Sequence, residues 1–212
     1  MQLYWFPNYI YSTLDQMSRD FIWKGSSRKG INLVAWTKIT RRRREGGLNT
    51  RISRFKNVSL LGKLVWDLLQ GHDKFWVLIM SKKYLLSDSI LKCQRKQGSY
   101  VWRAIIKACD FLLPGFKLKL GNGDVSFWFE DWTGEGPLCE KVWAIDVHDL
   151  EMRVRDVWNE EGWNLSSLWT SLSEDFNHVL LKQTLLLSEG LHDCIVWQPD
   201  LTGNYSAKSG YN

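Results

Sequence analysis

The sequence is poor in the side chains that most often bind metals or attack substrates. It has four cysteines and four histidines in 212 residues, and no Asp-Asp pair. The histidines show no HExxH, HxxxH or mixed Cys/His spacing. The cysteines are too far apart for a zinc knuckle or a redox pair, and we expect them to be reduced structural thiols. They stand at Cys93, Cys109, Cys139 and Cys194. Nucleophilic and metal catalysis therefore have little support in the sequence, and we predict no cofactor.

Long apolar runs are also missing. No stretch approaches the roughly 20 apolar residues that a membrane helix needs. The apolar segment 3–7 is short and has neither a basic leader nor a small-residue cleavage site. We therefore predict no membrane partner and an intracellular location, and an arginine run described below leaves a nuclear location open.

Charge is present in abundance but is divided unevenly. Residues 1–120 carry 23 Lys and Arg against 7 Asp and Glu, whereas residues 121–212 carry 5 against 16. The formal net charge of +5 thus conceals halves of +16 and −11. A half that basic attracts polyanions, because neutralising phosphates releases condensed counterions. Nucleic acid is the first partner to consider, and the alternative that the two halves neutralise each other stays open.

Apolar periodicity predicts an α+β fold with a mainly helical N-terminal half. The chain is 44% hydrophobic and has 13 Trp, most of which, including Trp36 and Trp66, we assign to the core. We expect helices over 14–23, 32–40, 57–70, 73–84 and from Ser99 to the Pro114-Gly115 stop. In the fourth helix the inward side chains would be Phe75, Trp76, Ile79 and Met80.

A period of two replaces the helical pattern after residue 115. Residues 116–120 and 125–129 alternate around Asn122-Gly123, which predicts a β-hairpin. A second hairpin is expected between 194–198 and 204–206, with a helix beginning near Ser206. Short helical pieces are expected at 154–158, 164–172 and 176–187.

Three local patterns in the C-terminal half could be mistaken for catalytic or ligand sites. We predict that Glu130-Asp131 forms a structural turn, with Asp131 bonding backbone or a Trp N–H, because neighbouring strand residues face opposite sides. Gly121-Asn122-Gly123 lacks the following helix and Lys-Ser/Thr of a phosphate loop. Near His192-Asp193, Cys194 is expected to pack.

The candidate site is a basic cluster in the N-terminal half. Arginine offers a bidentate fork to phosphate oxygens and can stack on bases, and Trp36 and Phe55 are interleaved with the cations. This composition indicates a groove that follows the nucleic-acid backbone without reading bases. A solvated or nuclear-targeting patch remains the alternative. The proposed phosphate contacts are Lys38, Arg41, Arg42, Arg43, Arg44, Arg51, Arg54 and Lys56.

Many Trp and Gly residues, in a fixed order, give the chain a family resemblance. It resembles the segment that follows the polymerase core in polyproteins of plant LINE-type (non-LTR) retrotransposons, often labelled reverse transcriptase or ribonuclease H proteins. The matching motifs are Phe21-Ile22-Trp23-Lys24-Gly25, Trp36 with Gly46-Gly47-Leu48, Asn57 with Leu60-Leu61-Gly62-Lys63-Leu64-Val65-Trp66, Phe75-Trp76 to Lys83-Tyr84, Ser99 with Trp102, Gly121-Asn122-Gly123 with Phe127-Trp128, Asp131-Trp132, Val154-Arg155-Asp156-Val157, Trp163-Asn164, Asp193 with Trp197, and Gly203 to Tyr211. One departure is Thr40 to Arg44, where the family usually has a Pro-Lys pair.

The resemblance implies three segments. Residues 1–113 would be a basic, helical, thumb-like connection, 114–193 a hairpin and acidic linker region, and 194–212 the start of the reverse-transcriptase zinc-binding domain. Its zinc ligands would lie beyond residue 212, the Tyr-x-Asp-Asp polymerase motif upstream, and the ribonuclease H carboxylates downstream. We therefore expect a piece cut at both ends, whose apolar stripe of Val58, Leu61, Val65 and Leu68 is left exposed.

The leading hypothesis is a non-catalytic fragment of a non-LTR retrotransposon reverse transcriptase that contacts the backbone of RNA, DNA or a hybrid. The polymerase and nuclease domains of the parent polyprotein would be its other partners. Two alternatives remain: an active RNA-directed DNA polymerase or ribonuclease H-type enzyme, and a decayed open reading frame without function.

Overall fold

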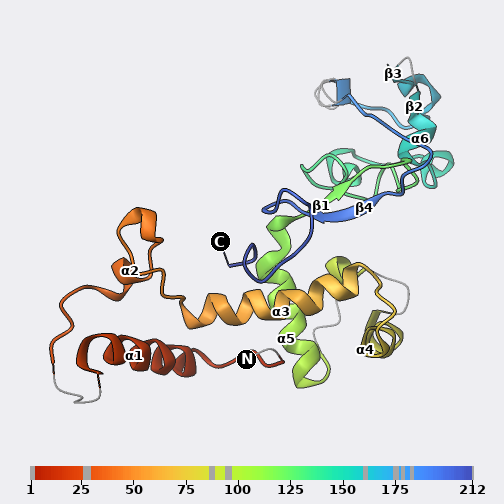
Figure 1. Cartoon of the computed structure of the whole chain (residues 1–212). Coiled ribbons are helices and arrows are strands. Elements are labelled where there is room, and N and C mark those ends of the chain that lie inside the picture. Colours follow the sequence, from red (N-terminus) through yellow and green to blue (C-terminus); the bar gives the residue numbers. More distant parts are fainter. Residues whose placement is uncertain are drawn as a thin grey trace. The chain divides into compact units, whose positions relative to one another are not determined.

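The protein folds as two compact units that are connected twice. The computed structural model describes residues 3–25, 30–85, 89–93, 97–159, 162–173, 177, 180–181 and 184–211. Unit 1 comprises Met1–Pro114 and Pro199–Asn212, and unit 2 comprises Gly115–Gln198. Helices dominate the N-terminal half and short antiparallel strands follow (Figure 1). The predicted α+β class, mainly helical in its first half, is confirmed.

The first two helices of unit 1 differ from their predicted lengths in opposite directions. Helix α1 (Asn8–Lys24) includes all of the predicted helix 14–23 and ends at Gly25, whose φ of 55° stops it. Helix α2 is a single turn (Trp36–Ile39), because residues 30–35 are not helical. The predicted helix 32–40 was therefore too long.

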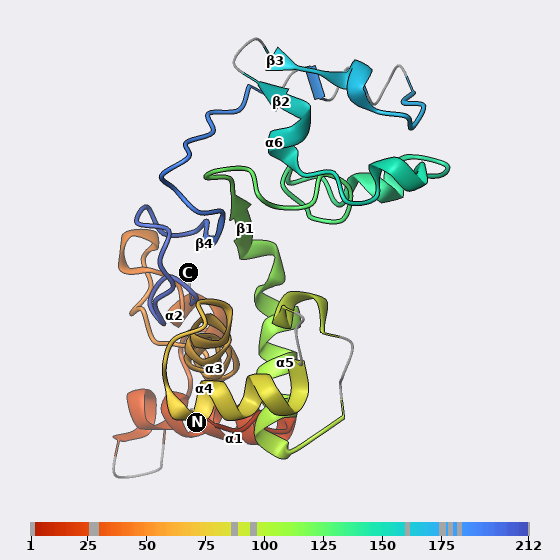
Figure 2. The ribbon, with the colours of Figure 1, turned by 90° about the vertical axis from the view of Figure 1, so that its right-hand side faces the viewer.

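Helices α3 (Ser53–Leu69) and α5 (Tyr100–Leu112) form the core of unit 1. They cross each other in Figure 1, and Figure 2 shows α3 nearly end-on beside α5. Ser99 caps α5 as predicted, since its Oγ accepts a hydrogen bond from the Trp102 N–H at 3.2 Å. The expectation of an exposed stripe on α3 is wrong. Its four side chains are at most 6% exposed, because unit 1 itself covers Val58, Leu61, Val65 and Leu68.

The segment after α3 buries different residues from those predicted. Helix α4 (Phe75–Met80) continues into a π-helical turn, Ser81–Leu85, which ends the 3.6-residue period. Tyr84 is buried there, stacks on Trp102 with 4.4 Å between ring centroids, and accepts the Ser99 N–H at 3.2 Å. Val77 is buried as well, whereas Phe75 and Ile79 are 79% and 47% exposed. The inward placement of Phe75 and Ile79 was therefore wrong.

The C-terminal segment of unit 1 packs on α3 through Tyr205. The Tyr205 hydroxyl donates to the Ser59 carbonyl at 2.9 Å, and its burial raises the pKa of the phenol. Gly62 leaves room for the ring, because a Cβ there would collide with the Tyr205 hydroxyl and lie 2.5 Å from Leu112 Cδ1. In place of the helix expected from Ser206, residues 207–211 form turns. Residues 194–198 lie in unit 2, so the third predicted segment is shared between the units.

Unit 2 contains two small antiparallel sheets. Strand β1 (Phe116–Lys119) pairs with β4 (Cys194–Trp197), with Phe116 opposite Trp197. Strand β2 (Trp158–Asn159) pairs with β3 (Gly162–Trp163). Both predicted hairpins are therefore wrong, because the two strands that were assigned to different hairpins pair with each other.

A single carboxylate explains why Asn122-Gly123 does not close a hairpin. Asp193 lies beside the start of β4 and accepts hydrogen bonds from the N–H groups of three loop residues: Gly121 at 2.6 Å, Gly123 at 3.0 Å and Val125 at 3.1 Å. These amides are directed at a distant side chain and not at a facing strand. Charge-assisted bonds of this kind are stronger than neutral ladder bonds, so the long-range contact overrides the local turn preference.

The core of unit 2 is aromatic. Its buried members are Phe127, Trp128, Trp132, Leu138, Val154, Val157 and Leu180. The predicted piece at 154–158 is confirmed as helix α6 (Val154–Val157), whereas 164–172 contains one 3₁₀ turn at Leu165–Ser167. Of the predicted helix 176–187, residues 177, 180 and 181 are helical and residues 184–187 are not, while 176, 178–179 and 182–183 lie outside the described residues. The other 3₁₀ turns of the described chain are Arg43–Glu45, Ile90–Lys92, Leu113–Gly115, Leu138–Lys141 and Val147–Asp149.

The tryptophans are less uniformly buried than predicted. Trp102, Trp128, Trp132 and Trp197 are buried, while Trp143 and Trp169 are exposed. Trp36 and Trp66 are half-buried, so their assignment to the core is correct in part. Across the described ranges, no helix combines the length and the apolar character that a membrane span requires.

Gly62 provides a test of the packing on α3. Alanine is favoured over glycine by about 1 kcal/mol inside an ordinary helix, but here the added methyl must displace Tyr205 and Leu112. We expect Gly62→Ala to lower the free energy of unfolding by about 1–3 kcal/mol, measured by urea denaturation. Lys63→Ala, at the exposed next position, is the matched control. Stabilisation by Gly62→Ala would contradict this packing.

Candidate nucleic-acid interface

The arginine run lies in a closed loop that begins with α2 and ends shortly before α3. We call residues 36–49 the basic loop. Backbone hydrogen bonds close it, from the Leu48 N–H to the Ile39 carbonyl at 2.8 Å and from the Asn49 N–H to the Arg41 carbonyl at 3.0 Å. Ile39 is buried at its base. The arginines thus stand on a backbone that is hydrogen-bonded to itself.

Two glycines allow the basic loop to turn back. Gly46 has a φ of 80°, in the left-handed region that favours glycine. A Cβ on Gly47 would lie 2.5 Å from the Arg41 carbonyl carbon, so the chain could not pass there with a side chain. The two adjacent glycines thus let the chain turn back just after the arginines.

Four cations of the basic loop are open to solvent. Lys38, Arg41, Arg43 and Arg44 are exposed, and Arg42 is half-buried. Arg44 contacts the neighbouring carboxylate of Glu45, with 3.7 Å between Nε and Oε1. An exposed ion pair of this length contributes little energy, so the loop as a whole remains strongly positive.

The remaining predicted cations lie at the start of α3, next along the chain. Arg51, Arg54 and Lys56 are exposed. The guanidinium of Arg51 lies over the Tyr211 ring, 5.2 Å from its centroid. Arginine can stack on an aromatic face and still present N–H donors to a phosphate.

The first amides of α3 are already used by the protein itself. The Ile52 N–H donates to the Tyr211 hydroxyl at 2.8 Å, and the Ser53 N–H donates to Asp15 Oδ1 at 2.9 Å. These two amides are therefore not open to a phosphate, and binding in this region would depend mainly on side-chain cations. The eight predicted residues thus occupy one continuous stretch, from α2 to the first turn of α3, and seven of them are exposed.

The acidic pair of unit 2 has a structural role. Asp131 Oδ1 accepts the N–H groups of Gly134 at 2.8 Å and Gly136 at 3.0 Å, so the predicted turn is confirmed. The Trp132 indole donates to the Phe127 carbonyl at 2.9 Å. Among the described residues, no group of three or more His, Cys, Asp or Glu side chains is placed to hold a metal ion.

The four cysteines are free thiols in different surroundings. Cys109 is buried in α5, and this burial raises the pKa of its thiol to about 12. Cys194 is exposed at the start of β4, so the expectation that it packs is wrong. Its neighbour Asp193 is occupied by the loop at residues 121–125. Cys93 and Cys139 are half-buried.

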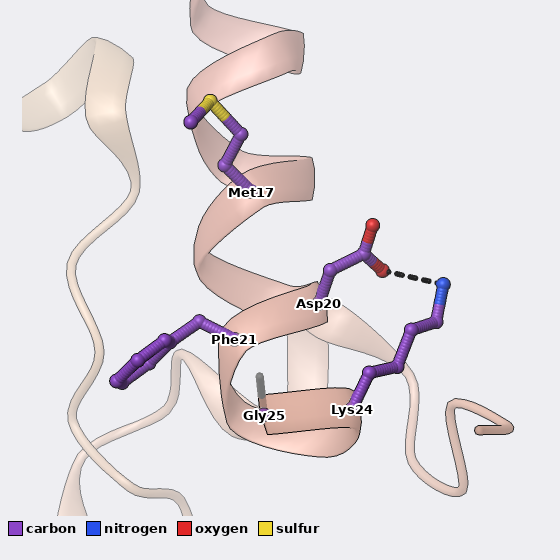
Figure 3. Close-up of a pocket in the computed structure, with 5 residues that line it drawn as sticks. All are labelled: Met17, Asp20, Phe21, Lys24 and Gly25. Carbon is purple, nitrogen blue, oxygen red and sulfur yellow. Dashed lines mark ion pairs between the residues drawn. The ribbon is translucent and has the colours of Figure 1, made fainter. Parts of the chain in front are cut away.

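The last turns of α1 line a hollow of about 380 Å³ (Figure 3). Its side chains come from Met17, Asp20, Phe21 and Lys24, with Gly25 at its end. Met17 and Phe21 are 64% and 78% exposed, and Lys24 pairs with Asp20 at 3.0 Å. The hollow is thus apolar on one side and carries a neutralised ion pair on the other, which gives it little attraction for a charged ligand.

Comparison with known proteins shows one similarity that spans the chain. The chain is 30% identical over 213 aligned residues to an Arabidopsis thaliana protein named "Putative ribonuclease H protein", and the alignment covers 97% of this chain and 34% of that protein. The chain spans about a third of the length of this relative. No protein-family model and no solved structure matches. This similarity to a plant protein agrees with the resemblance to plant polyproteins that the motifs indicate.

Thiol labelling tests the contrast between Cys109 and Cys194. Iodoacetamide reacts with the thiolate, and a pKa of about 12 leaves very little thiolate on Cys109 at pH 8. At this pH we expect Cys194 to be alkylated first and Cys109 on the order of a thousandfold more slowly than an ordinary thiol. Peptide mass spectrometry of timed samples gives the order, and a urea-unfolded sample should label all four residues. Equal rates in the folded protein would contradict the burial of Cys109.

Proposed function

We propose that this chain binds nucleic acid through the phosphate backbone and that it is a non-catalytic piece of a retrotransposon reverse transcriptase. The basic loop and the start of α3 form the binding surface. RNA, DNA and a hybrid are all admissible ligands, because a surface of this kind recognises phosphate. In this proposal the protein is intracellular, and polymerase and nuclease domains of a longer polyprotein complete its activity.

The exposure of the arginines carries this proposal. Lys38, Arg41, Arg43 and Arg44 project from a loop whose backbone is closed on itself, and one exposed carboxylate stands beside them. Each cation that neutralises a phosphate releases counterions, which makes binding entropic and independent of sequence. Arginine in particular can hold two phosphate oxygens at once.

The similarity to a protein named for ribonuclease H agrees with a nucleic-acid ligand, although that name belongs to a relative about three times as long. The ordered motifs from Phe21-Ile22-Trp23-Lys24-Gly25 to Gly203-Asn204-Tyr205 add the finer assignment to a LINE-type polyprotein. On this assignment the thumb-like connection, the acidic linker and the start of a zinc-binding domain are three consecutive parts of one enzyme.

Asp131 and Asp193, the carboxylates in the two local patterns that could be mistaken for catalytic sites, support a non-catalytic role. Asp131 accepts two backbone N–H groups, and Asp193 accepts three. Their oxygens shape two loops of unit 2. Primer-extension and hybrid-cleavage assays on the purified chain test this part of the proposal. Activity that disappears in Asp131→Asn would replace it with the enzyme alternative.

Salt dependence tests the backbone contacts. We expect the affinity for an RNA–DNA hybrid to fall steeply between 50 and 200 mM salt, because seven exposed cations permit a log–log slope as steep as about −6. Replacing Arg41, Arg43 and Arg44 together with Gln should reduce the magnitude of this slope by about 2 to 3. Fluorescence anisotropy with a labelled hybrid and a labelled DNA duplex gives both slopes.

A matched variant removes the same charge elsewhere. Lys82, Lys119 and Lys208 are exposed and lie outside the basic loop. Their joint replacement with Gln should change the slope by less than about 1. Binding that is insensitive to salt, binding that is undetectable for both ligands, or equal effects of the two triple variants would defeat the proposal.

A further inference from the structure

A hollow on unit 1, outside the predicted cluster, combines aromatic rings with cations. Its volume is about 210 Å³, and it lies between the N-terminal segment and one face of α5. The helix contributes Tyr100, Arg103, Ala104 and Lys107, which share one side because they are spaced by three, four and seven residues. Among the described residues that line this hollow, none is acidic. We call it the aromatic pocket.

Two cations of the aromatic pocket rest on two of its rings. The Arg103 guanidinium lies 4.5 Å from the centroid of Tyr100, and Lys107 Nζ lies 6.0 Å from the centroid of Trp5. Tyr100 is 74% exposed, whereas Ala104 is buried and forms the floor. Isolated pairs of this kind are common in proteins. Here, however, two such ring–cation pairs lie in the same open hollow. A single ligand could therefore contact both aromatic faces and both positive charges.

A buried amide holds the N-terminal wall of the aromatic pocket in place. Asn57 of α3 is fully buried, and its Nδ2 donates to the Tyr4 carbonyl at 3.1 Å. Its Oδ1 accepts the Tyr11 hydroxyl at 2.5 Å, and that hydroxyl accepts the Phe6 N–H at 3.0 Å. Residues 4–6 are thus fixed by hydrogen bonds to α1 and α3. The aromatic pocket is therefore built by the fold of unit 1 and not by a chance approach of side chains.

The geometry points to a binding site for an unpaired nucleotide in the aromatic pocket. The base would stack on Tyr100 or Trp5, and Arg103 and Lys107 would move from the rings to the phosphates on either side. Stacking on an aromatic face accepts any base, since every base has a π-face, and cationic side chains follow the backbone. This inference rests on the proposed nucleic-acid binding and adds a preference for single-stranded segments.

An anionic membrane surface is the competing ligand. Tyr, Trp, Lys and Arg also gather where a protein meets lipid headgroups. The aromatic pocket favours a nucleotide because Tyr100, Arg103 and Lys107 follow one stripe of a helix whose other face is the core of unit 1. A single hollow with two ring–cation pairs fits a base with its flanking phosphates better than a flat array of headgroups.

An abasic oligonucleotide separates stacking from charge. We would measure the anisotropy of a labelled 12-nucleotide oligothymidylate and of an abasic 12-mer with the same number of phosphates. Tyr100→Ala should weaken binding of the oligothymidylate by about fivefold or more, since stacking on one ring is lost, and should leave the abasic strand unaffected. Tyr100→Phe keeps the ring and should bind normally. Phe75→Ala, which removes an exposed aromatic side chain of α4, is the matched control.

The outcomes distinguish this site from the basic loop. The triple replacement of Arg41, Arg43 and Arg44 should weaken both strands, and its failure to do so would count against the proposed function alone. Equal loss of both strands in Tyr100→Ala, or no loss of either, would overturn the nucleotide site. Vesicles of phosphatidylserine and phosphatidylcholine complete the test. Vesicle binding that depends on Tyr100, without an effect on the oligothymidylate, would assign the aromatic pocket to membranes and overturn the inference.

Discussion

The close contact between Gly62 of α3 and the ring of Tyr205 is the constraint on which the rest of unit 1 depends. It lets a segment from the end of the chain lie on a helix from its first third, with the Tyr205 hydroxyl bonded to the Ser59 carbonyl at 2.9 Å. The same segment brings Tyr211 to the start of α3, where its hydroxyl accepts the Ile52 N–H and its ring carries Arg51. A packing contact in the core thereby orders one edge of the proposed binding surface.

Two kinds of polar group show how this protein uses its polar side chains. Several buried ones are bonded to the chain: Asn57 ties residues 4–11 to α3, and Asp149 in unit 2 accepts the Thr170 N–H at 2.7 Å. Such bonds are necessary, because an unsatisfied buried polar group costs more than a bond contributes. Most cations of the basic loop lie at the surface, where they contribute little to folding. That division is expected for a scaffold whose surface charge serves a ligand.

Local patterns predicted the three long helices well, but they overestimated the short ones and predicted strand pairing poorly. The helix α3 and the Ser99 cap of α5 follow from neighbours within a few residues, and both are confirmed, whereas the predicted exposure of the α3 stripe is wrong because distant parts of unit 1 cover it. The hairpin at Asn122-Gly123 failed because Asp193, some 70 residues away, collects the amides that a hairpin would need. The inward face of α4 was wrong: Val77 is buried in place of Phe75 and Ile79, and the stack of Tyr84 on Trp102 that anchors the following π-helical turn is a long-range contact. Contacts between residues so far apart in the chain produce no periodic pattern in a single sequence, so they could not be predicted from it.

The positive charge of the candidate surface could be predicted from the sequence. Consecutive arginines indicated it. Arg41, Arg43 and Arg44 are exposed and Arg42 is half-buried, and their contact with nucleic acid stays a prediction. The aromatic pocket was not anticipated, because Tyr4 and Trp5 meet α5 only through the anchor at Asn57. The spacing of Tyr100, Arg103 and Lys107 on the face opposite the apolar stripe of α5 was the one available signal. This spacing becomes informative only when the buried face of α5 is known, because the three residues then lie on the exposed face.

Arginine footprinting tests the central claim most directly. The folded chain would be labelled with phenylglyoxal, with and without saturating RNA–DNA hybrid, and each arginine would be read by peptide mass spectrometry. The account predicts that Arg41, Arg43 and Arg44 are protected by the hybrid. Arg153 and Arg155, which pair with Asp124 in unit 2, should keep their labelling. Unchanged labelling of the loop arginines at saturation, or protection confined to unit 2, would contradict it.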